Sequence, residues 1–321
     1  MRDLPSVRGV SVLGTGTMAP GIAVVFAQAG LDVTLWGRTE HRAHAARARA
    51  GRAAELLATE KLGPPAADTL NRIHVADTLA EAVADVDLVV EAISEDLAAK
   101  QTFLAEVEAV CARQTLIATN TSGLRVTDIA NRLEYPDRAV AMLFWNPAHL
   151  MPIVEIVGGE QTAQTSVEGA QQVALDCKKV PVVLKREVLG FLGTRLQQVM
   201  VREAVALLDA GVASAADIDL AVRTSFGIRL PAIGPLESAD LSGLDVIEAV
   251  HQYLLPDLDN STAPQPGLHV RVAAGDVGVK SGRGFYDWEG NRGRDVAERR
   301  DRELIRRARL LAEAGLEEVA G

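Results

Sequence analysis

The sequence has little of what marks secreted, metal-dependent or membrane proteins. Its 321 residues include two cysteines, Cys111 and Cys177, which are far apart and have neither metal-ligand nor redox spacing. We therefore expect two reduced core thiols and no metal site, which is typical of a cytoplasmic protein. No apolar run is long enough to cross a bilayer. The N-terminal residues lead directly into the first expected strand, so we expect no signal peptide.

An excess of basic charge is also missing. The formal net charge is −10 at pH 7, and no basic patch of the kind that binds nucleic acid is evident. The strongest basic run, residues 299–309, alternates with Asp301, Glu303 and apolar residues and is typical of a solvated helix face. An acidic surface is not attracted to anionic lipid. We expect a small-molecule substrate, and neither nucleic acid nor membrane as a partner.

The chain does contain enough apolar residues, 48%, for two domains with their own cores, and it has no internal repeat or low-complexity linker. Residues 8–38 hold the most informative pattern, a strand, a glycine turn, a helix and a second strand. This order is that of a dinucleotide-binding unit. Gly14 allows the tight turn, and Gly16 lets the backbone approach a pyrophosphate. Thr17 and Met18 begin the helix whose free N–H groups we expect at the phosphates.

The end of the second strand indicates which cofactor is bound. NAD enzymes place an acidic residue here, on the ribose hydroxyls, whereas this chain has Gly37, Arg38 and Thr39. No carboxylate repels a 2′-phosphate, and a guanidinium and a hydroxyl can bind one. We therefore expect NADP(H) in preference to NAD(H). The alternative is a solvated Arg38 in a protein that binds NAD.

The alternation of strands and helices predicts an α/β fold, a Rossmann-type doubly wound parallel sheet over residues 1–187. The expected strands are residues 10–13, 33–36, 72–75, 87–93, 115–120, 139–144, 153–157 and 180–184. After residue 184 only helical patterns follow, over residues 191–210, 214–222, 245–254 and 296–314. Their apolar stripes are too numerous for one small core. We therefore expect residues 188–321 to form an all-helical domain through which a homodimer assembles, with 256–267 as a surface loop or lid.

Seven stretches together resemble the 3-hydroxyacyl-CoA dehydrogenase family. They are residues 13–22 (LGTGTMAPGI), 89–100 (VVEAISEDLAAK), 118–124 (ATNTSGL), 144–155 (FWNPAHLMPIVE), 190–195 (GFLGTR), 234–245 (GPLESADLSGLD) and 280–287 (KSGRGFYD). The resemblance implies a Rossmann-type domain followed by a helical, dimer-forming domain. It also implies hydride transfer between a nicotinamide ring and the 3-position of a hydroxyacyl or ketoacyl group.

The resemblance implies roles for several residues of this chain. Glu95 and Lys100 match positions near the nicotinamide end of the cofactor, and Asn120 also matches a cofactor position. An ion pair on a helix face is the alternative for Glu95 and Lys100. Ser122 matches a hydroxyl that lies against the substrate oxygen, with a strand-end cap as the alternative. Asn146 shapes the loop after the sixth expected strand.

The chain departs from the family pattern at the catalytic base. The pattern His-Phe-Phe-Asn-Pro begins with Leu143 here, although Glu155 keeps the carboxylate that would orient the histidine. The family asparagine of Gly-Phe-Ile-Val-Asn-Arg is Thr194. The serine and lysine that hold CoA also lack counterparts, since residues 38–68 contain no serine and Lys61 as their only lysine. A positioned base contributes roughly 10² to 10⁴ in rate, and leucine supplies none of it.

Three functions are compatible with this departure. We favour reduction of a C=N bond, because an iminium carries its own proton and charge, Glu155 can attract it, and Leu143 suits a bulky apolar amine. The alternative is a 3-hydroxyacyl-CoA or 3-hydroxy acid dehydrogenase with another proton carrier among Ser122, Thr194, Glu155 and His149. A catalytically inactive nucleotide-binding protein is the third.

Overall fold

The computed structural model describes residues 7–314 and divides the chain into two compact units. Unit 1 runs to Thr194 and takes in the segment from Arg299, and unit 2 is Arg195–Glu298. The sequence predicted one helical domain over 188–321, and the structure differs at both ends of that range. The C-terminal segment joins unit 1 because Ile305, 6% exposed, packs into the core of that unit.

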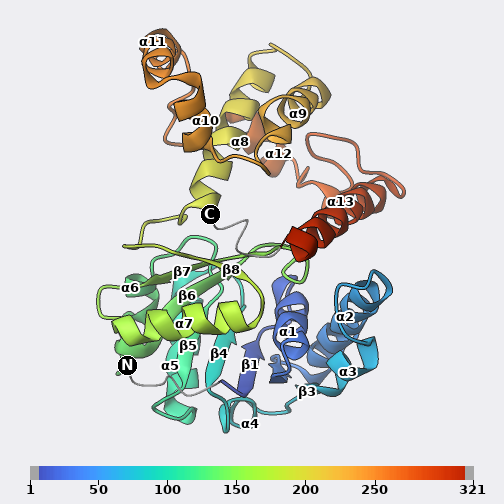
Figure 1. The fold of residues 1–321 in the computed structure, drawn as a ribbon, viewed down its shortest axis with the longest axis vertical. Coiled ribbons are helices and arrows are strands. Elements are labelled where there is room, and N and C mark those ends of the chain that lie inside the picture. The colour runs from blue at the N-terminus through green and yellow to red at the C-terminus, as the bar shows by residue number, and fades with distance from the viewer. Residues whose placement is uncertain (1–6, 315–321) are drawn as a thin grey trace. The chain divides into compact units, whose positions relative to one another are not determined.

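Unit 1 is built on one eight-stranded sheet with the order β3-β2-β1-β4-β5-β6-β7-β8 (Figure 1). Each of the eight expected strands is present. Their bounds are β1 (Gly9–Leu13), β2 (Asp32–Trp36), β3 (Ile73–Val75), β4 (Leu88–Glu91), β5 (Leu116–Thr119), β6 (Ala139–Phe144), β7 (Ile153–Gly158) and β8 (Val180–Val183). The order reverses between β1 and β4, which makes the carboxyl ends of these two strands the place where α/β sheets of this kind bind ligands.

The expectation of a purely parallel sheet was wrong for one strand pair. β6 and β7 run antiparallel, with Leu143 opposite Glu155. Residues 145–152 form a short connection, whereas a parallel crossover needs about a dozen residues or more. β7 and β8 are parallel, because α7 (Gln164–Asp176) connects them. As a result β7 begins at the edge where β6 ends, and Glu155 lies near that edge.

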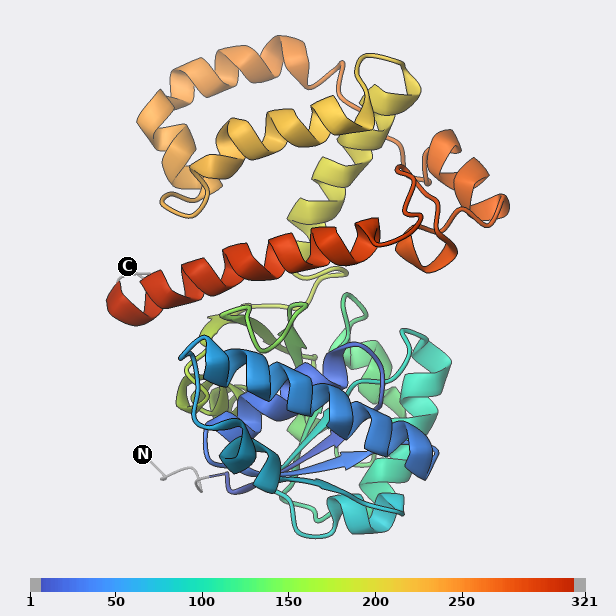
Figure 2. The ribbon, with the colours of Figure 1, turned by 90° about the vertical axis from the view of Figure 1, so that its right-hand side faces the viewer.

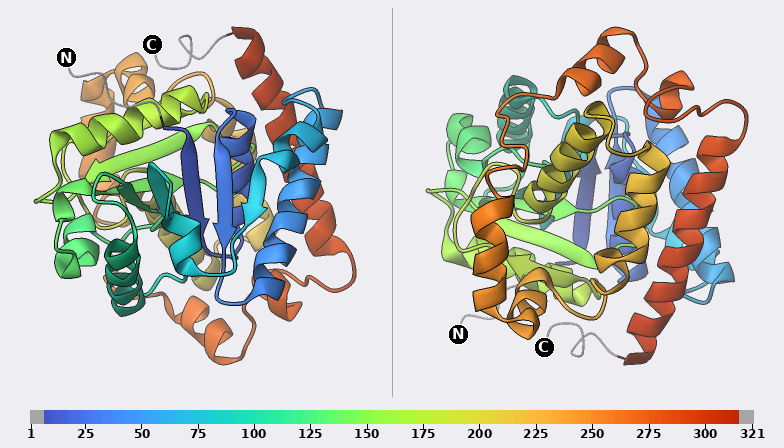
Figure 3. Two further views of the ribbon diagram at one scale, coloured as in Figure 1. Left: turned by 90° about the horizontal axis from the view of Figure 1, so that it is seen from below. Right: turned by 90° about the horizontal axis from the view of Figure 1, so that it is seen from above.

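Helices cover both faces of the sheet, as the alternating pattern predicted (Figure 3). One face packs with α7, α1 (Met18–Gln28) and α2 (Glu40–Thr59) into the largest apolar cluster, and α3 (Ala66–Asn71) packs on α2. The other face packs with α4 (Leu79–Val83), α5 (Leu97–Val110) and α6 (Val126–Ile129). α2 and α3 lie on the side of unit 1 that faces the viewer in Figure 2. Thr78 and Glu81 form a capping box at the start of α4.

Unit 2 is helical and has few buried side chains. Its elements are α8 (Gly193–Asp209, which begins in unit 1), α9 (Ala215–Thr224), α10 (Pro235–Ser242), α11 (Leu244–Leu254), α12 (Pro266–Ala273) and the first turns of α13 (Arg292–Ala314). The sequence reading missed α10 and α12, although each has proline at its first position, a common helix start. α12 takes up the end of the expected 256–267 loop. Within residues 7–314, no helix is both long enough and apolar enough to cross a membrane.

Candidate active site

The residues that the sequence singled out gather at one edge of the sheet. β1, β4, β5 and β6 all end there, followed in turn by the glycine turn, by Glu95, by Ser122 and by Asn146. The register pairs Leu13 with Trp36 on one side and with Glu91 on the other, so these three strands end level. This edge is where an α/β sheet offers polar groups to a ligand. Among residues 7–314, no group of three or more His, Cys, Asp or Glu side chains could hold a metal ion, and both cysteines are free thiols.

The glycine turn has the geometry that a pyrophosphate needs. Gly14 has a φ of +144°, and a Cβ there would collide with the carbonyl oxygen of Ala92. Its N–H donates to the carbonyl of Trp36 at 2.9 Å, which ties the turn to β2. A Cβ on Gly16 would meet no atom closer than 4.0 Å, so the backbone is open to a ligand. Thr17 precedes Met18 at the start of α1 and makes no side-chain cap, so the first N–H groups remain available for phosphate.

The end of β2 carries no acidic side chain where NAD enzymes have one. Gly37 is buried, and a Cβ there would collide with Cγ2 of Thr15. Arg38 is exposed beside it. Thr39 is the N-cap of α2, and its hydroxyl accepts a hydrogen bond from the N–H of Arg42 at 3.4 Å. Two neighbouring positions therefore carry a cation and a hydroxyl, and neither carries a carboxylate.

A buried ion pair lies behind this edge. Lys100 on α5 is fully buried and donates to both carboxylate oxygens of Glu91, at 2.8 and 3.0 Å. Glu91, also fully buried, accepts a further hydrogen bond from Thr119 at 2.6 Å. The sequence reading assigned Lys100 to the cofactor but overlooked Glu91. A lone carboxylate in the apolar strand DLVVE was the available signal, because a buried charge needs a partner.

Glu95 connects this pair to the exposed edge. One carboxylate oxygen accepts hydrogen bonds from the Thr121 hydroxyl at 2.6 Å and from the N–H and hydroxyl of Ser122 at 2.8 and 3.0 Å. The other oxygen lies 3.4 Å from Nζ of Lys100. Burial alone would raise the pKa of Glu95, but these hydrogen bonds and the Lys100 charge outweigh it and hold the pKa below its usual value. Glu95 is therefore a carboxylate at neutral pH, with an exposed serine hydroxyl bonded to it.

The site of the missing histidine is apolar and closed. Leu143 is 6% exposed and packs in a cluster with Val157, Leu184 and Phe191. The opposite residue, Glu155, is 1% exposed, so a histidine at position 143 would have had a carboxylate beside it. The arrangement retains the acidic half of the pair that the family resemblance implies, with an alkyl side chain in place of the base.

Glu155 has other partners in this chain. Its carboxylate accepts from the indole N–H of Trp145 at 3.0 Å, from the N–H of Leu192 at 2.8 Å, and from the N–H of Gly193 at 3.2 and 3.3 Å. The last two donors lie at the start of α8, where a negative charge is favourable. Thr194 follows them in the first turn of that helix. Glu155 thus holds Trp145 and the beginning of α8 in place, a role that the sequence reading did not include.

The loop after β6 is fixed by residues on both sides. The Asn120 side chain accepts from the N–H of Phe144 at 2.8 Å and so joins the end of β5 to the end of β6. Lys179 is 7% exposed and donates to the carbonyls of Ala148 and Met151, at 2.8 Å each. Burial lowers the pKa of Lys179 to about 8. Asn146, exposed at the start of this loop, is therefore presented by a firmly held backbone.

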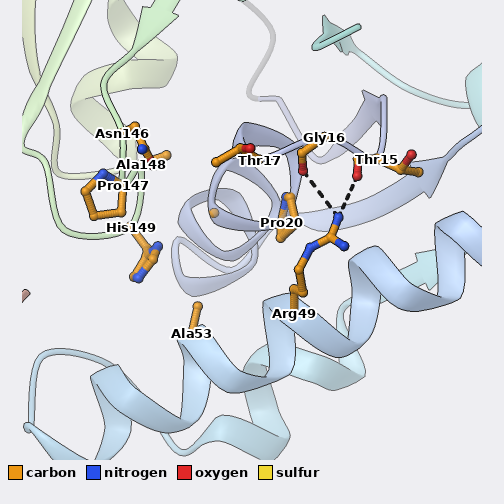
Figure 4. Close-up of a pocket in the computed structure, with 11 residues that line it drawn as sticks. Thr15, Gly16, Thr17, Pro20, Arg49, Ala53, Asn146, Pro147, Ala148 and His149 are labelled. Carbon is orange, nitrogen blue, oxygen red and sulfur yellow. Dashed lines mark hydrogen bonds between the residues drawn. The ribbon is translucent and has the colours of Figure 1, made fainter. Parts of the chain in front are cut away.

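A cavity of about 500 Å³ lies between the glycine turn, α2 and this loop (Figure 4). Arg49 of α2 lines it and donates to the carbonyls of Thr15 and Gly16, at 2.5 and 3.3 Å. His149 lines the opposite wall, and burial lowers its pKa to about 4. The sequence reading missed Arg49, because its position depends on the direction in which α2 crosses the sheet edge.

Comparisons with known proteins agree with this architecture. Residues 9–188 match the model of the 3-hydroxyacyl-CoA dehydrogenase NAD binding domain, and residues 190–288 match that of the 3-hydroxyacyl-CoA dehydrogenase C-terminal domain. A 3-hydroxybutyryl-CoA dehydrogenase of Clostridioides difficile is 34% identical over 87% of this chain and 99% of its own. An L-carnitine dehydrogenase of Nocardiopsis dassonvillei is 32% identical over 98% of this chain and 95% of its own.

One relative is matched in both sequence and structure. The 5-formyl-3-hydroxy-2-methylpyridine 4-carboxylate 5-dehydrogenase of Mesorhizobium japonicum is 30% identical over 95% of this chain and 98% of its own. A crystal structure of an enzyme with this activity, described as an NAD⁺-dependent dismutase, superposes with a TM-score of 0.89 over 95% of this chain and 99% of its own. The chain therefore belongs to the 3-hydroxyacyl-CoA dehydrogenase family of NAD-binding oxidoreductases.

Proposed function

We propose that the protein interconverts a hydroxyl and a carbonyl group on a compact 3-hydroxy or 3-oxo acid, with NADP(H) as the hydride carrier. The relatives named above are all called dehydrogenases, two of them after acids that carry no CoA. This favours carbonyl chemistry over the imine reduction that the sequence alone suggested. Residues 38–68, without a serine and with Lys61 as their only lysine, favour a free acid over a CoA thioester.

The observation that carries the proposal is the hydrogen bond from the Ser122 hydroxyl to Glu95. When an alcohol is oxidised, its proton must leave as the hydride leaves. Ser122 is exposed and can accept that proton while passing its own to the carboxylate of Glu95. The hydrogen bond from Thr121, the charge of Lys100 and the hydrogen bonds from Ser122 keep Glu95 ionised and ready to accept. This pair takes over the work that a histidine at position 143 would do, and bound nicotinamide would accept the hydride.

The preference for NADP(H) rests on the end of β2. Position 37 carries no carboxylate, and an aspartate there would require the Thr15 methyl to move. The exposed guanidinium of Arg38 is free to meet a 2′-phosphate with charge-assisted hydrogen bonds. The named crystal structure is of an NAD⁺-dependent enzyme, so this preference would separate the present chain from that relative.

Reduction of a C=N bond is a second candidate function, and Leu143 is the observation that favours it. An iminium substrate brings its own proton, so a closed apolar wall in place of a base does not slow it. The carboxylate of Glu155 lies beside that wall, although its oxygens are bonded to Trp145, Leu192 and Gly193. The bulky apolar amine expected from the sequence would pack on Trp145, which is partly buried against the cluster that contains Leu143.

We also propose that the active form is a homodimer joined through unit 2. The helices α9 to α12 bury no residue within the chain. Leu236, Leu241 and Tyr253 are 81%, 77% and 70% exposed. Apolar side chains at this density are typical of a surface covered by a second copy. Sedimentation equilibrium of the intact protein should give twice the chain mass, and Tyr253→Arg should shift it toward the monomer.

The function is tested by following the oxidation of NADPH by its absorbance. The reaction contains acetoacetate, acetoacetyl-CoA or a cyclic imine, and a control contains no substrate. Oxidation of NADPH with acetoacetate supports the proposal. Oxidation with the imine alone supports the second candidate. Cofactor binding without turnover of any compound contradicts both and leaves an inactive nucleotide-binding protein.

A further inference from the structure

Helix α13 lies beyond the part of the chain that the family models cover. The match to the C-terminal domain ends at residue 288, and α13 begins at Arg292. From Arg299 onward the helix belongs to unit 1, together with the cofactor turn and α2. A long helix on the nucleotide-binding unit is thus an element that the family models do not account for.

The buried side of this segment is apolar and joins the core of unit 1. Ile305 is 6% exposed and lies in the cluster that contains Ala148 and Leu150 of the loop after β6. Leu304 packs against the same cluster, as do Ala53 and Leu56 of α2. The segment therefore shares one apolar cluster with the loop and with α2, the two elements that wall the cavity.

Charged residues extend these contacts to both walls. Arg309 donates to the carbonyl of Glu60 at 3.3 Å and forms an ion pair with the Glu60 carboxylate, immediately after the end of α2. At the other end, the charges of Asp301 and Arg300 act on His149 in the loop. Nine residues separate Arg300 from Arg309, which is about 13 Å along a helix. The segment is thus bonded to the end of α2 at Arg309, and its other end carries charges that act on the loop.

We call residues 299–314 the strap. The order of residues along α2 shows at which end of that helix the strap is attached. Arg49 contacts the glycine turn, Ala53 lies one turn farther on, and Glu60 lies beyond both. Figure 4 shows Arg49 reaching from α2 to the turn, with Ala53 farther along the helix. Arg309 therefore attaches the strap to the end of α2 that is remote from the cofactor turn.

The inner end of the cavity is polar. The Arg49 guanidinium lies against the turn, and Nδ1 of His149 is buried and has no hydrogen-bond partner in the part of the chain that the structure describes. The His149 ring packs on α1, since a Cβ on Gly21 would lie 3.2 Å from Nδ1. Arg49 and the His149 ring line the same cavity, and the Arg49 cation suits the carboxylate of a small acid.

We propose that residues 299–314 are a specificity element, which closes the remote end of the cavity so that it accepts a compact free acid, held near Arg49 and His149, and excludes a carrier-bound thioester. The inference rests on the proposed function, whose substrate class it narrows. It gives the helix beyond the family models a role: residues 38–68 lack the serine and all lysines but Lys61, and the helix is bonded to Glu60 at the end of that same region.

A matched pair of variants on one helix tests this. Ile305→Glu places a charge in the apolar cluster and should displace the strap, whereas Leu310→Glu makes the same change at a position that is 59% exposed. The probes are acetoacetate and acetoacetyl-CoA, compared by kcat/KM with NADPH. The ratio of the thioester to the free acid should rise by about tenfold or more in Ile305→Glu and stay unchanged in Leu310→Glu.

A second pair covers the case in which Ile305→Glu does not fold. Arg309→Glu faces the Glu60 carboxylate and should loosen the strap, and Glu60→Arg/Arg309→Glu restores the pair with its charges exchanged. The ratio of kcat/KM for acetoacetyl-CoA to that for acetoacetate should rise in Arg309→Glu. It should return to the value of the native protein in Glu60→Arg/Arg309→Glu. Thermal unfolding and the dissociation constant for NADPH verify that each variant is folded and binds cofactor.

Three results would overturn the inference: an intact protein that uses acetoacetyl-CoA as well as acetoacetate, a ratio unchanged in the displaced variants, or an equal rise in Leu310→Glu. If neither compound is turned over, the proposed function fails, and calorimetric binding of the same two compounds still decides about the strap. Binding of acetoacetyl-CoA to the intact chain then contradicts the proposed role of the strap. Binding that appears only in Ile305→Glu or Arg309→Glu supports that role.

Discussion

Thr15 and Gly37 share one space at the edge of the sheet, because the Cγ2 methyl of Thr15 lies where a Cβ at residue 37 would be. The first residue belongs to the cofactor turn and the second to the end of β2. A side chain at position 37 therefore requires the Thr15 methyl to turn away or a smaller residue at position 15. The two positions together decide whether a carboxylate can face the adenosine ribose.

Substitutions at Arg38, Thr15 and Gly37 should change the preference between NADPH and NADH. Arg38→Ala removes a charge-assisted contact to the 2′-phosphate, and kcat/KM for NADPH should fall by about 10- to 100-fold while that for NADH changes little. Thr15→Ala/Gly37→Asp should raise kcat/KM for NADH. Gly37→Asp alone should lower the stability of the fold, because its side chain collides with Thr15. Initial rates with both cofactors measure this. Equal losses for the two cofactors in Arg38→Ala would show that Arg38 does not read the phosphate.

The Ser122 hydroxyl should be needed for turnover. Ser122→Ala removes the group that passes the proton to Glu95, and kcat should fall about 100-fold, whereas Ser122→Thr keeps a hydroxyl and should lose much less. Because the pKa of Glu95 lies below its usual value, the rate should also stay level from about pH 5.5 to 8. A full rate in Ser122→Ala would remove this pair from the mechanism.

Position 143 should accept the base that it lacks. Leu143→His places an imidazole opposite Glu155, and turnover of the 3-oxo acid should rise by about tenfold or more with a new break in the pH profile near 6.5. Leu143→Gln is polar but does not titrate, so it should give neither effect. The cluster around Leu143 is apolar, and both variants should lose on the order of 1–3 kcal/mol of stability. An unchanged pH profile in Leu143→His would mean that the imidazole does not reach the reacting group.

The positions of the strands and of the glycine turn follow from local sequence patterns and were predicted. The direction in which a strand or helix runs does not follow from such patterns and was not predicted. Alternating apolar runs sufficed for the eight strands, and the glycine turn sufficed for the place of the cofactor. β7 runs against β6 because of a short connection, and no apolar pattern encodes direction. Arg49 reaches the turn because α2 crosses the edge, a consequence of tertiary packing.

Two further features of the structure depend on contacts between residues that are not neighbours in the sequence, and the sequence pattern alone does not reveal such contacts. Lys100 is predicted to lie near the cofactor, and the structure adds that it donates to both carboxylate oxygens of Glu91. The basic run at 299–309 resembled a solvated helix face, and most of its arginines are indeed on the surface. Ile305 within that run is nevertheless a core residue, because its helix packs on unit 1.

The buried pair of Lys100 and Glu91 should contribute to stability as a unit. Lys100→Met leaves the Glu91 carboxylate buried without its cation and should cost about 3–5 kcal/mol in the free energy of unfolding. Glu91→Gln/Lys100→Met removes both charges and should cost clearly less. Urea unfolding of the single and double variants measures the difference. A double variant as unstable as Lys100→Met would mean that packing, and not the unpaired charge, causes the loss.

His149 should make stability depend on pH in the acid range. Burial lowers its pKa from 6.5 to about 4, with Lys179 and Arg300 adding to the shift and Asp301 opposing it. Between these two values the unfolded chain binds the proton and the folded chain does not, so stability is lost as the pH falls from about 6.5 to 4. A shift of this size corresponds to about 3 kcal/mol. His149→Gln cannot titrate, and its free energy of unfolding should therefore fall less than that of the native protein over the same range. Parallel curves for the two proteins would show that the imidazole is protonated as easily in the fold as in water.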